Sequence, residues 1–174
     1  MEKSSLYKIP IVALKNKVHH FEYKLDGEFF KSFDNNNINE FDIEVKIELE
    51  KRDSIIVLLF LIDGTINLTC DRCLDTYSQN IFGDYKLIIQ FGGDLNQDND
   101  NDDDIILMPK NSDFIEVSKP IYDYTSLSLP IKHVHTSNKD CNQKMIDIIN
   151  KTLKEKQKKE IDPRWEVLNK LKNK

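Results

Sequence analysis

The sequence predicts an α+β fold: an antiparallel β-rich core, either a sheet or a partly closed barrel, with short covering helices and C-terminal helices. Residues 41–50 (FDIEVKIELE) alternate apolar and charged side chains, as a half-buried strand does. After four polar residues, 55–62 (IIVLLFLI) form an apolar, β-branched run that is typical of a strand covered on both faces, paired with the first in a hairpin. The last forty residues instead show helical spacing.

The first half of the chain carries further strand patterns on either side of this hairpin. We expect strands at 7–13 and 18–25, and then a short helix that Asp26 caps. This helix presents an aromatic face formed by Phe29, Phe30 and Phe33. Alternation continues after Gly64 at Ile66, Leu68 and Cys70, and returns at Tyr85, Leu87, Ile89 and Phe91 before two glycines.

The second half is expected to become helical. Short strands at 105–108 and 113–117 precede a helix that Ser118 caps and Pro130 ends. Its apolar face is Ile121, Tyr124 and Leu127. Asn142 is the N-cap candidate of the next helix, whose apolar stripe is Met145, Ile148, Ile149 and Leu153. A last amphipathic helix begins with Asp162 as N-cap and Pro163 at its first position, with Trp165, Leu168 and Leu171 on one side.

Charge is distributed unevenly along the 174 residues. The whole chain has a net charge of −5, yet residues 151–174 hold nine Lys or Arg against four Asp or Glu. Residues 94–104 contain six aspartates and no base, which predicts a solvated loop between strands. We therefore expect a β-rich segment, residues 1–135, that includes this acidic loop, and a basic helical segment, 136–174, that belongs to the same domain.

Two cysteines, Cys70 and Cys73, stand three positions apart in CDRCLDTY. A tight turn could direct both sulfurs to one metal ion, and His133, His135 and Cys141 in KHVHTSNKDC could complete a four-ligand zinc site. The simpler alternative, which the sequence favours, makes Cys70 a small buried side chain at the end of a strand and Cys73 the start of a turn. Three cysteines without an export signal argue against a disulfide framework.

The sequence offers no catalytic site. A redox cysteine pair needs a helix N-terminus, but the residues after Cys73 have no long helical pattern. Nucleophile-elbow glycines, a phosphate-binding loop and a helical histidine pair are all missing from the sequence. The longest apolar run is too short to cross a bilayer, and the first residues lack a signal-peptide pattern. We expect a cytoplasmic, non-enzymatic protein without a small-molecule substrate.

Four segments in this order give the chain a family resemblance: IPIVALKNKVHHFEY, LTCDRCLDTY, YDYTSLSLPIKHVH and DPRWEVLNKLK. The chain resembles the YceD family over nearly its whole length, most specifically at these positions: Cys70, Arg72, Cys73, Leu74, Leu129, Pro130, Ile131, Asp162, Pro163, Arg164, Leu168 and Leu171. These are bacterial and plastid proteins named for the accumulation of large-subunit ribosomal RNA. Many members carry a second cysteine cluster after the segment matching Leu129 and Pro130, where this chain has only Cys141.

The resemblance implies a part in large-subunit assembly, with ribosomal RNA or an early large-subunit protein as partner and no catalytic step. The lysine-rich end could neutralise phosphates, although a solvated helix would show the same lysines. We expect the contacts at Arg72, Lys132, Lys154, Lys156, Lys158, Lys159, Arg164, Trp165 and Lys170. The alternative is a protein adaptor with a structural zinc knuckle and no RNA contact, which binds its partner through apolar surface around Tyr122, Tyr124 and the final helix.

Overall fold

The computed structural model describes residues 6–33, 40–92 and 105–157 and divides the chain into two compact units. The first unit comprises residues 1–68 and 78–131, and the second comprises 69–77 and 132–174. Each unit therefore contains two stretches that are distant in the sequence. The expected assignment of residues 1–135 and 136–174 to one domain stays a prediction.

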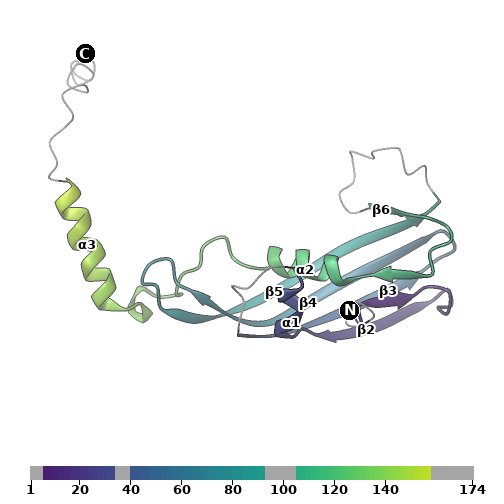
Figure 1. The fold of residues 1–174 in the computed structure, drawn as a ribbon, viewed down its shortest axis with the longest axis horizontal. Coiled ribbons are helices and arrows are strands. Elements are labelled where there is room, and N and C mark those ends of the chain that lie inside the picture. Colours follow the sequence, from purple (N-terminus) through teal and green to yellow (C-terminus); the bar gives the residue numbers. More distant parts are fainter. Residues whose placement is uncertain (1–5, 34–39, 93–104, 158–174) are drawn as a thin grey trace, which may run out of the picture. The chain divides into compact units, whose positions relative to one another are not determined.

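The first unit is built on a five-stranded sheet in the order β2-β3-β4-β5-β6. Its strands are β2 (Val18–Lys24), β3 (Phe41–Lys51), β4 (Ile55–Thr69), β5 (Thr76–Phe91) and β6 (Ile105–Met108). β3 is antiparallel to both β2 and β4, whereas β6 runs parallel to β5. A small second sheet pairs β1 (Lys8–Pro10) with β7 (Phe114–Glu116) (Figure 1). The predicted α+β fold with a strand-rich core is confirmed.

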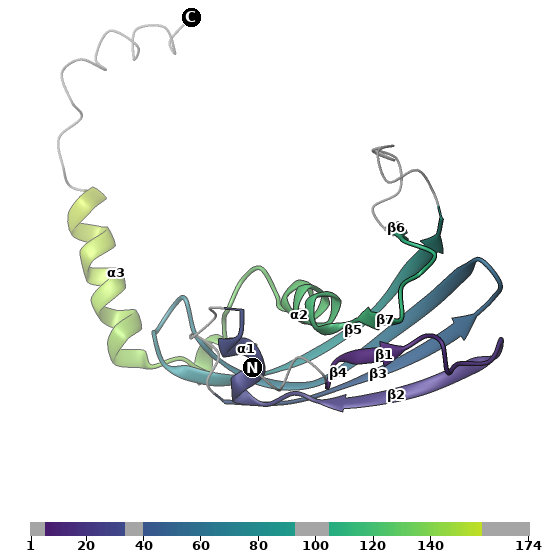
Figure 2. The ribbon, with the colours of Figure 1, turned by 45° about the vertical axis from the view of Figure 1, so that its right-hand side comes forward.

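The core lies on one face of the five-stranded sheet, which we call the inner face. β3 and β4 turn alternate side chains toward it, and these are almost fully buried: Ile43, Val45, Ile47, Leu49, Ile56, Leu58, Phe60 and Ile62. Helices α1 (Gly27–Lys31) and α2 (Ser118–Leu127) lie over this face together with β1 and β7 (Figure 2). Apolar burial on one side of the sheet is thus the main stabilising contribution in this unit.

The expectation that β4 is covered on both faces is wrong. Leu59 and Leu61 are 41% and 47% exposed, because they point to the opposite, outer face of the sheet. β4 is also longer than its apolar run, since the alternation continues through Gly64 to Thr69. β5 begins at Thr76, well before the predicted start at Tyr85.

The predictions of helices after Asp26 and at Ser118 are confirmed in position and corrected in detail. Asp26 caps α1, its side chain accepting from the Phe29 N–H at 2.9 Å. The prediction that Ser118 caps α2 is wrong: Ser118 is the first helical residue, and the N-cap position is Val117, whose side chain cannot accept a hydrogen bond. The Ser118 hydroxyl donates to Glu116. The buried residues of α2 are Ile121 and Thr125, whereas Leu127 is 68% exposed.

Two tyrosines of α2 pack into the aromatic part of the core. Tyr122 stacks on Phe33 with ring centroids 4.4 Å apart. Tyr124 stacks on Tyr85 at 4.6 Å, nearly parallel to it. Both tyrosines are partly buried, so the protein's own side chains cover part of the apolar adaptor surface that is expected around them.

α3 (Gln143–Gln157) belongs to the second unit, and Asn142 caps it as predicted, its side-chain oxygen accepting from the Lys144 N–H. No helix of the described ranges is both long and apolar enough to span a membrane. The acidic run at 94–104 and the predicted helix at 162–174 lie outside the residues that the structure describes.

Gly64 permits the close approach of β3 and β4. It pairs with Ile43, and a Cβ added there would overlap the Asp42 carbonyl oxygen and lie 2.7 Å from the Ile43 Cα. We predict that Gly64→Ala lowers the free energy of unfolding by about 1–3 kcal/mol through overpacking, measured by urea denaturation of the full chain. Gly27→Ala is the matched control, since its Cβ would meet no atom within 4 Å. Equal stabilities for the two variants would contradict the role given to Gly64.

Candidate metal centre

The Cys-x-x-Cys segment forms a closed turn between β4 and β5. The Cys70 N–H donates to the Asp75 carbonyl at 2.9 Å, and the Leu74 N–H donates to the Cys70 carbonyl at 2.8 Å. Leu74 has a positive φ of 62°, which is uncommon for a residue that is not glycine. The turn therefore holds Cys70 and Cys73 in one fixed local geometry.

Reciprocal hydrogen bonds join this turn to the segment after α2. The Asp71 N–H donates to the His133 carbonyl at 2.7 Å, and the His133 N–H donates to the Asp71 carboxylate at 2.9 Å. Arg72 adds a third bond, from its Nη2 to the His135 carbonyl at 2.6 Å. Because these bonds fix the backbone on both sides of residue 134, they set the position of the His135 ring.

Four ligand atoms meet where the two segments join. Those of Cys70, Cys73, His135 and Cys141 all lie within 4.8 Å of one another. All three thiols are free and buried, and the imidazole is half-buried. The His135 Nδ1 lies 3.6 Å from the Cys73 Sγ and 3.6 Å from the Cys141 Sγ. The structure thus brings together four of the five predicted ligands, and the group does not include the ring of His133.

These residues fit a zinc ion in both chemistry and spacing. Three thiolates and one imidazole form a Cys₃His set, which is one of the closed structural zinc sites. Zn–S bonds of about 2.3 Å and Zn–N bonds of about 2.0–2.1 Å at tetrahedral angles separate nitrogen from sulfur by about 3.6 Å. Both measured separations from the His135 Nδ1 match this edge.

The thiols differ in how readily they lose their protons. Burial acts to raise the pKa of Cys70, but hydrogen bonds to its sulfur outweigh burial and lower the pKa to about 5. The backbone donors belong to His135, Arg72 and Cys73. Burial, followed by the hydrogen bond with Cys73, raises the pKa of Cys141 to about 11. At neutral pH the metal-free cluster therefore holds a thiolate at Cys70 and a thiol at Cys141.

Partly buried apolar side chains pack against the cluster, and we call them its apolar shell. It consists of Tyr77, Val134, Met145 and Ile146. The Tyr77 ring lies 5.0 Å from the His135 ring, and its hydroxyl is buried without a hydrogen-bond partner. The sequence pattern missed Tyr77, although it ends the CDRCLDTY motif, and also missed Ile146, which lies off the predicted stripe. Ile148, Ile149 and Leu153 of that stripe are 56%, 39% and 52% exposed.

The turn does not have the setting of a redox pair. β5 begins at Thr76, so no helix N-terminus follows Cys73 to stabilise a reactive thiolate. Cys70 has a low pKa, but it is fully buried, and a disulfide-exchange thiolate needs access. A metal ligand needs the same low pKa and benefits from burial.

The residues predicted to contact RNA lie in different parts of the structure. Arg72 is half-buried, donates to the His135 carbonyl, and has its Nε buried without a partner. Lys132 is exposed, one residue before the segment that pairs with the turn. Lys154 and Lys156 belong to α3, where the structure describes their backbone only. The remaining five lie outside the described residues: Lys158, Lys159, Arg164, Trp165 and Lys170.

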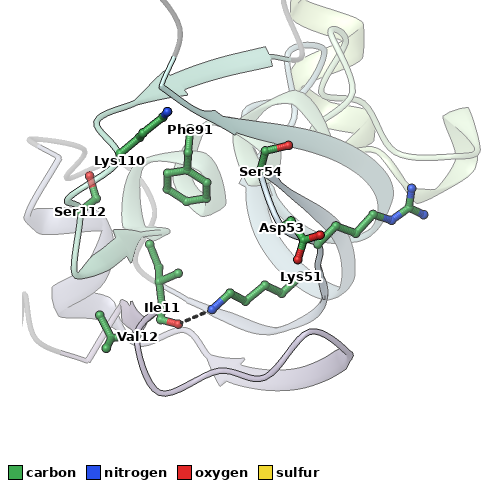
Figure 3. Close-up of a pocket in the computed structure, with 9 residues that line it drawn as sticks. Ile11, Val12, Lys51, Asp53, Ser54, Phe91, Lys110 and Ser112 are labelled. Atoms are coloured by element: carbon green, nitrogen blue, oxygen red, sulfur yellow. Dashed lines mark hydrogen bonds between the residues drawn. The ribbon is translucent and has the colours of Figure 1, made fainter.

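A pocket of about 450 Å³ in the first unit is a weaker candidate (Figure 3). Three cations line it, but two are already engaged. The Lys51 Nζ donates to the carbonyls of Ile11 and Leu14 at 2.9 and 2.8 Å, and Arg52 pairs with Glu50. Because Lys51 and Arg52 already bind oxygen atoms of the protein, their charges are not available to an anion in the pocket.

Substitution of single ligands tests the metal centre. We predict that the purified protein contains about one zinc ion per chain, and that Cys73→Ser and His135→Ala lose it. A zinc concentration 1,000-fold above Kd would stabilise the folded chain by about 4 kcal/mol, so a chelator should lower Tm for the native protein only. His133→Ala is the matched control and should keep its zinc. A metal-free, fully folded native protein would rule out the centre.

The proton on Cys141 makes metal binding depend on pH. Zinc binds the thiolate, and the pKa of about 11 means that Cys141 is protonated at neutral pH in the metal-free protein. Binding therefore releases this proton, and apparent zinc affinity should rise at least about tenfold for each pH unit between pH 6 and 8. Competition with a chromophoric chelator measures this slope. An affinity that stays constant across this range would show that Cys141 is not a ligand.

Comparison with protein families matches residues 58–172 to YceD, described as "Large ribosomal RNA subunit accumulation protein YceD". The matched segment contains all four members of the cluster and extends through most of the basic end of the chain. Comparisons with curated proteins and with solved structures gave no match. Since the match spans more than half of the 174 residues, the chain belongs to the YceD family.

Proposed function

We propose that this protein is a non-enzymatic factor in assembly of the large ribosomal subunit, which supports accumulation of its RNA by binding that RNA or an early large-subunit protein. The observation that carries the proposal is the family match over residues 58–172. The description of that family names large-subunit RNA accumulation. The matched segment includes the complete Cys/His cluster, so the same part of the chain contains the family signature and the candidate metal centre.

The metal centre supports a structural role within this function. When bound, zinc would supply cross-links between the turn at Cys70 and the segments that carry His135 and Cys141. Four protein ligands fill a tetrahedral zinc site, which leaves no open position for a substrate or an activated water. We infer that the second unit is a recognition module stabilised by metal, and that the protein performs no catalysis.

Contact with RNA is the first candidate mode of binding. Of the positions with a described backbone, Lys132, Lys151, Lys154 and Lys156 add positive residues to the second unit. The basic chain end from Lys158 onward extends this charge in the sequence. Neutralising phosphates with lysines releases counterions, so affinity should fall steeply with salt.

A protein adaptor is the second candidate, and α3 gives it specific support. Ile148, Ile149 and Leu153 are exposed apolar side chains at helical spacing. An amphipathic helix of this kind can bind in an apolar groove of a protein partner. This contact would survive nuclease treatment and high salt, whereas RNA-mediated contact would not.

Depletion and sedimentation test the assembly role. We predict that loss of the protein reduces large-subunit RNA relative to small-subunit RNA, and that the protein sediments with large-subunit precursors at low salt. Sedimentation that persists after nuclease and high salt would favour the adaptor. Retention at the top of the gradient, together with unchanged RNA levels on depletion, would contradict the proposal.

Lysine substitution tests direct binding to RNA. Replacing Lys154, Lys156, Lys158 and Lys159 by Gln should weaken binding to transcribed large-subunit RNA. The slope of log K against log salt should fall by about 0.7–0.9 for each phosphate that the variant no longer neutralises. The matched control replaces Lys15, Lys17 and Lys31, which are exposed in the first unit. Equal salt slopes for both variants would exclude RNA binding through the basic segment.

A further inference from the structure

Within the described residues of the first unit, the outer face of the five-stranded sheet is open. α1, α2 and the β1–β7 pair all lie on the inner side (Figure 2). Strand alternation sends every second residue of β3 and β4 to the outer side. No helix or strand among the described residues of the first unit covers those side chains.

Apolar side chains form a continuous patch on this face. Val57 and Ile88 lie side by side, because the Phe91 N–H donates to the Ser54 carbonyl and fixes the pairing of β4 with β5. Ile88 pairs with Ile105 of β6 in turn. Leu59 and Leu61 extend the row along β4 and are 41% and 47% exposed. We call Val57, Leu59, Leu61, Ile88 and Ile105 the outer patch.

Carboxylates border the outer patch on β3. Glu48 pairs with Leu59 and Glu50 with Val57, so each acid stands next to an apolar side chain. The outer side of β3 carries four acids and one lysine, a net charge of −3: Asp42, Glu44, Lys46, Glu48 and Glu50. Two of the acids are already paired, Asp42 with Lys24 and Glu50 with Arg52. The Glu48 carboxylate is 47% exposed and lies 4.0 Å from the His20 ring, and Lys46 stands next to Leu61. The face thus combines apolar surface with an acidic margin.

This combination selects among partner classes. An exposed apolar row in a sheet favours a partner with apolar side chains on one side. Carboxylates attract Lys and Arg and repel the phosphates of RNA. A basic polypeptide segment satisfies both conditions, whereas a nucleic acid satisfies neither.

We propose that the outer patch and its β3 carboxylates bind a basic polypeptide segment that presents apolar side chains to Leu59 and Leu61 and cations to Glu44 and Glu48. Only the identification of this segment as part of a large-subunit ribosomal protein rests on the proposed function. The residues of this surface belong to the first unit, whereas the residues of the metal centre belong to the second.

Synthetic peptides supply the probe. Overlapping 20-residue peptides that cover the large-subunit ribosomal proteins are screened against the full chain, and Kd values of the bound peptides are measured by fluorescence anisotropy. Leu59→Thr/Leu61→Thr keeps strand-forming residues while removing apolar surface. Glu44→Lys/Glu48→Lys reverses the charge. Leu127→Gln is the control, because Leu127 is an equally apolar, 68% exposed residue of the same unit, on α2.

We expect net-positive peptides to bind, with Kd raised at least tenfold by either double substitution and unchanged by Leu127→Gln. Binding that is insensitive to both double substitutions would overturn the inference, as would the absence of any bound peptide. Two specific results would also overturn it: self-association that Leu59→Thr/Leu61→Thr abolishes, or peptide binding that occurs only after residues 162–174 are removed. Self-association would assign the face to a second copy of the chain. Binding only after truncation would assign it to residues 162–174 of the chain itself.

The two proposals fail separately. Normal large-subunit RNA in depleted cells, together with patch-dependent peptide binding, would contradict the assembly role and leave the binding surface intact. Loss of large-subunit RNA on depletion, together with peptide Kd values that the outer-patch substitutions leave unchanged, would contradict only the proposed binding surface.

Discussion

The reciprocal hydrogen bonds between Asp71 and His133 connect residues 62 positions apart, and the second unit depends on them. Without them, the Cys-x-x-Cys turn would supply only two metal ligands. With them, His135 and Cys141 lie beside the turn, and four ligand atoms meet within 4.8 Å. Because the bonds involve the backbone of His133, this residue contributes to the centre through its position rather than its ring.

The first unit depends on a different constraint, the strict alternation of side chains along β3 and β4. Since successive residues point to opposite faces, one apolar row can enter the core only if the intervening residues face outward. In β3 those residues are charged, so the outer face is solvated there. In β4 they are apolar as far as Leu61, so the same alternation leaves leucines exposed. The open face therefore follows from the composition of one strand.

Sequence reasoning located most elements because their signals are local. The alternation of β3, the Asp26 cap and the Asn142 cap each depend on neighbouring residues. It misjudged β4, because a continuous apolar run does not distinguish a strand buried on both faces from one with an exposed side. It named Cys70, Cys73, His135 and Cys141 as candidates, but their assembly depends on pairing across 62 residues, which no local pattern contains.

Arg72 shows how the metal centre constrains the rest of the second unit. Three thiolates around a dication leave one excess negative charge, and a buried charge is costly unless it is paired. The guanidinium of Arg72 stands at this site: it lowers the pKa of Cys141, whereas burial raises it, and it donates to the His135 carbonyl. The Arg72 side chain is thus bound within the second unit, where its charge would balance the cluster. This engagement of Arg72 leaves the lysines as the candidates for the proposed contact with RNA.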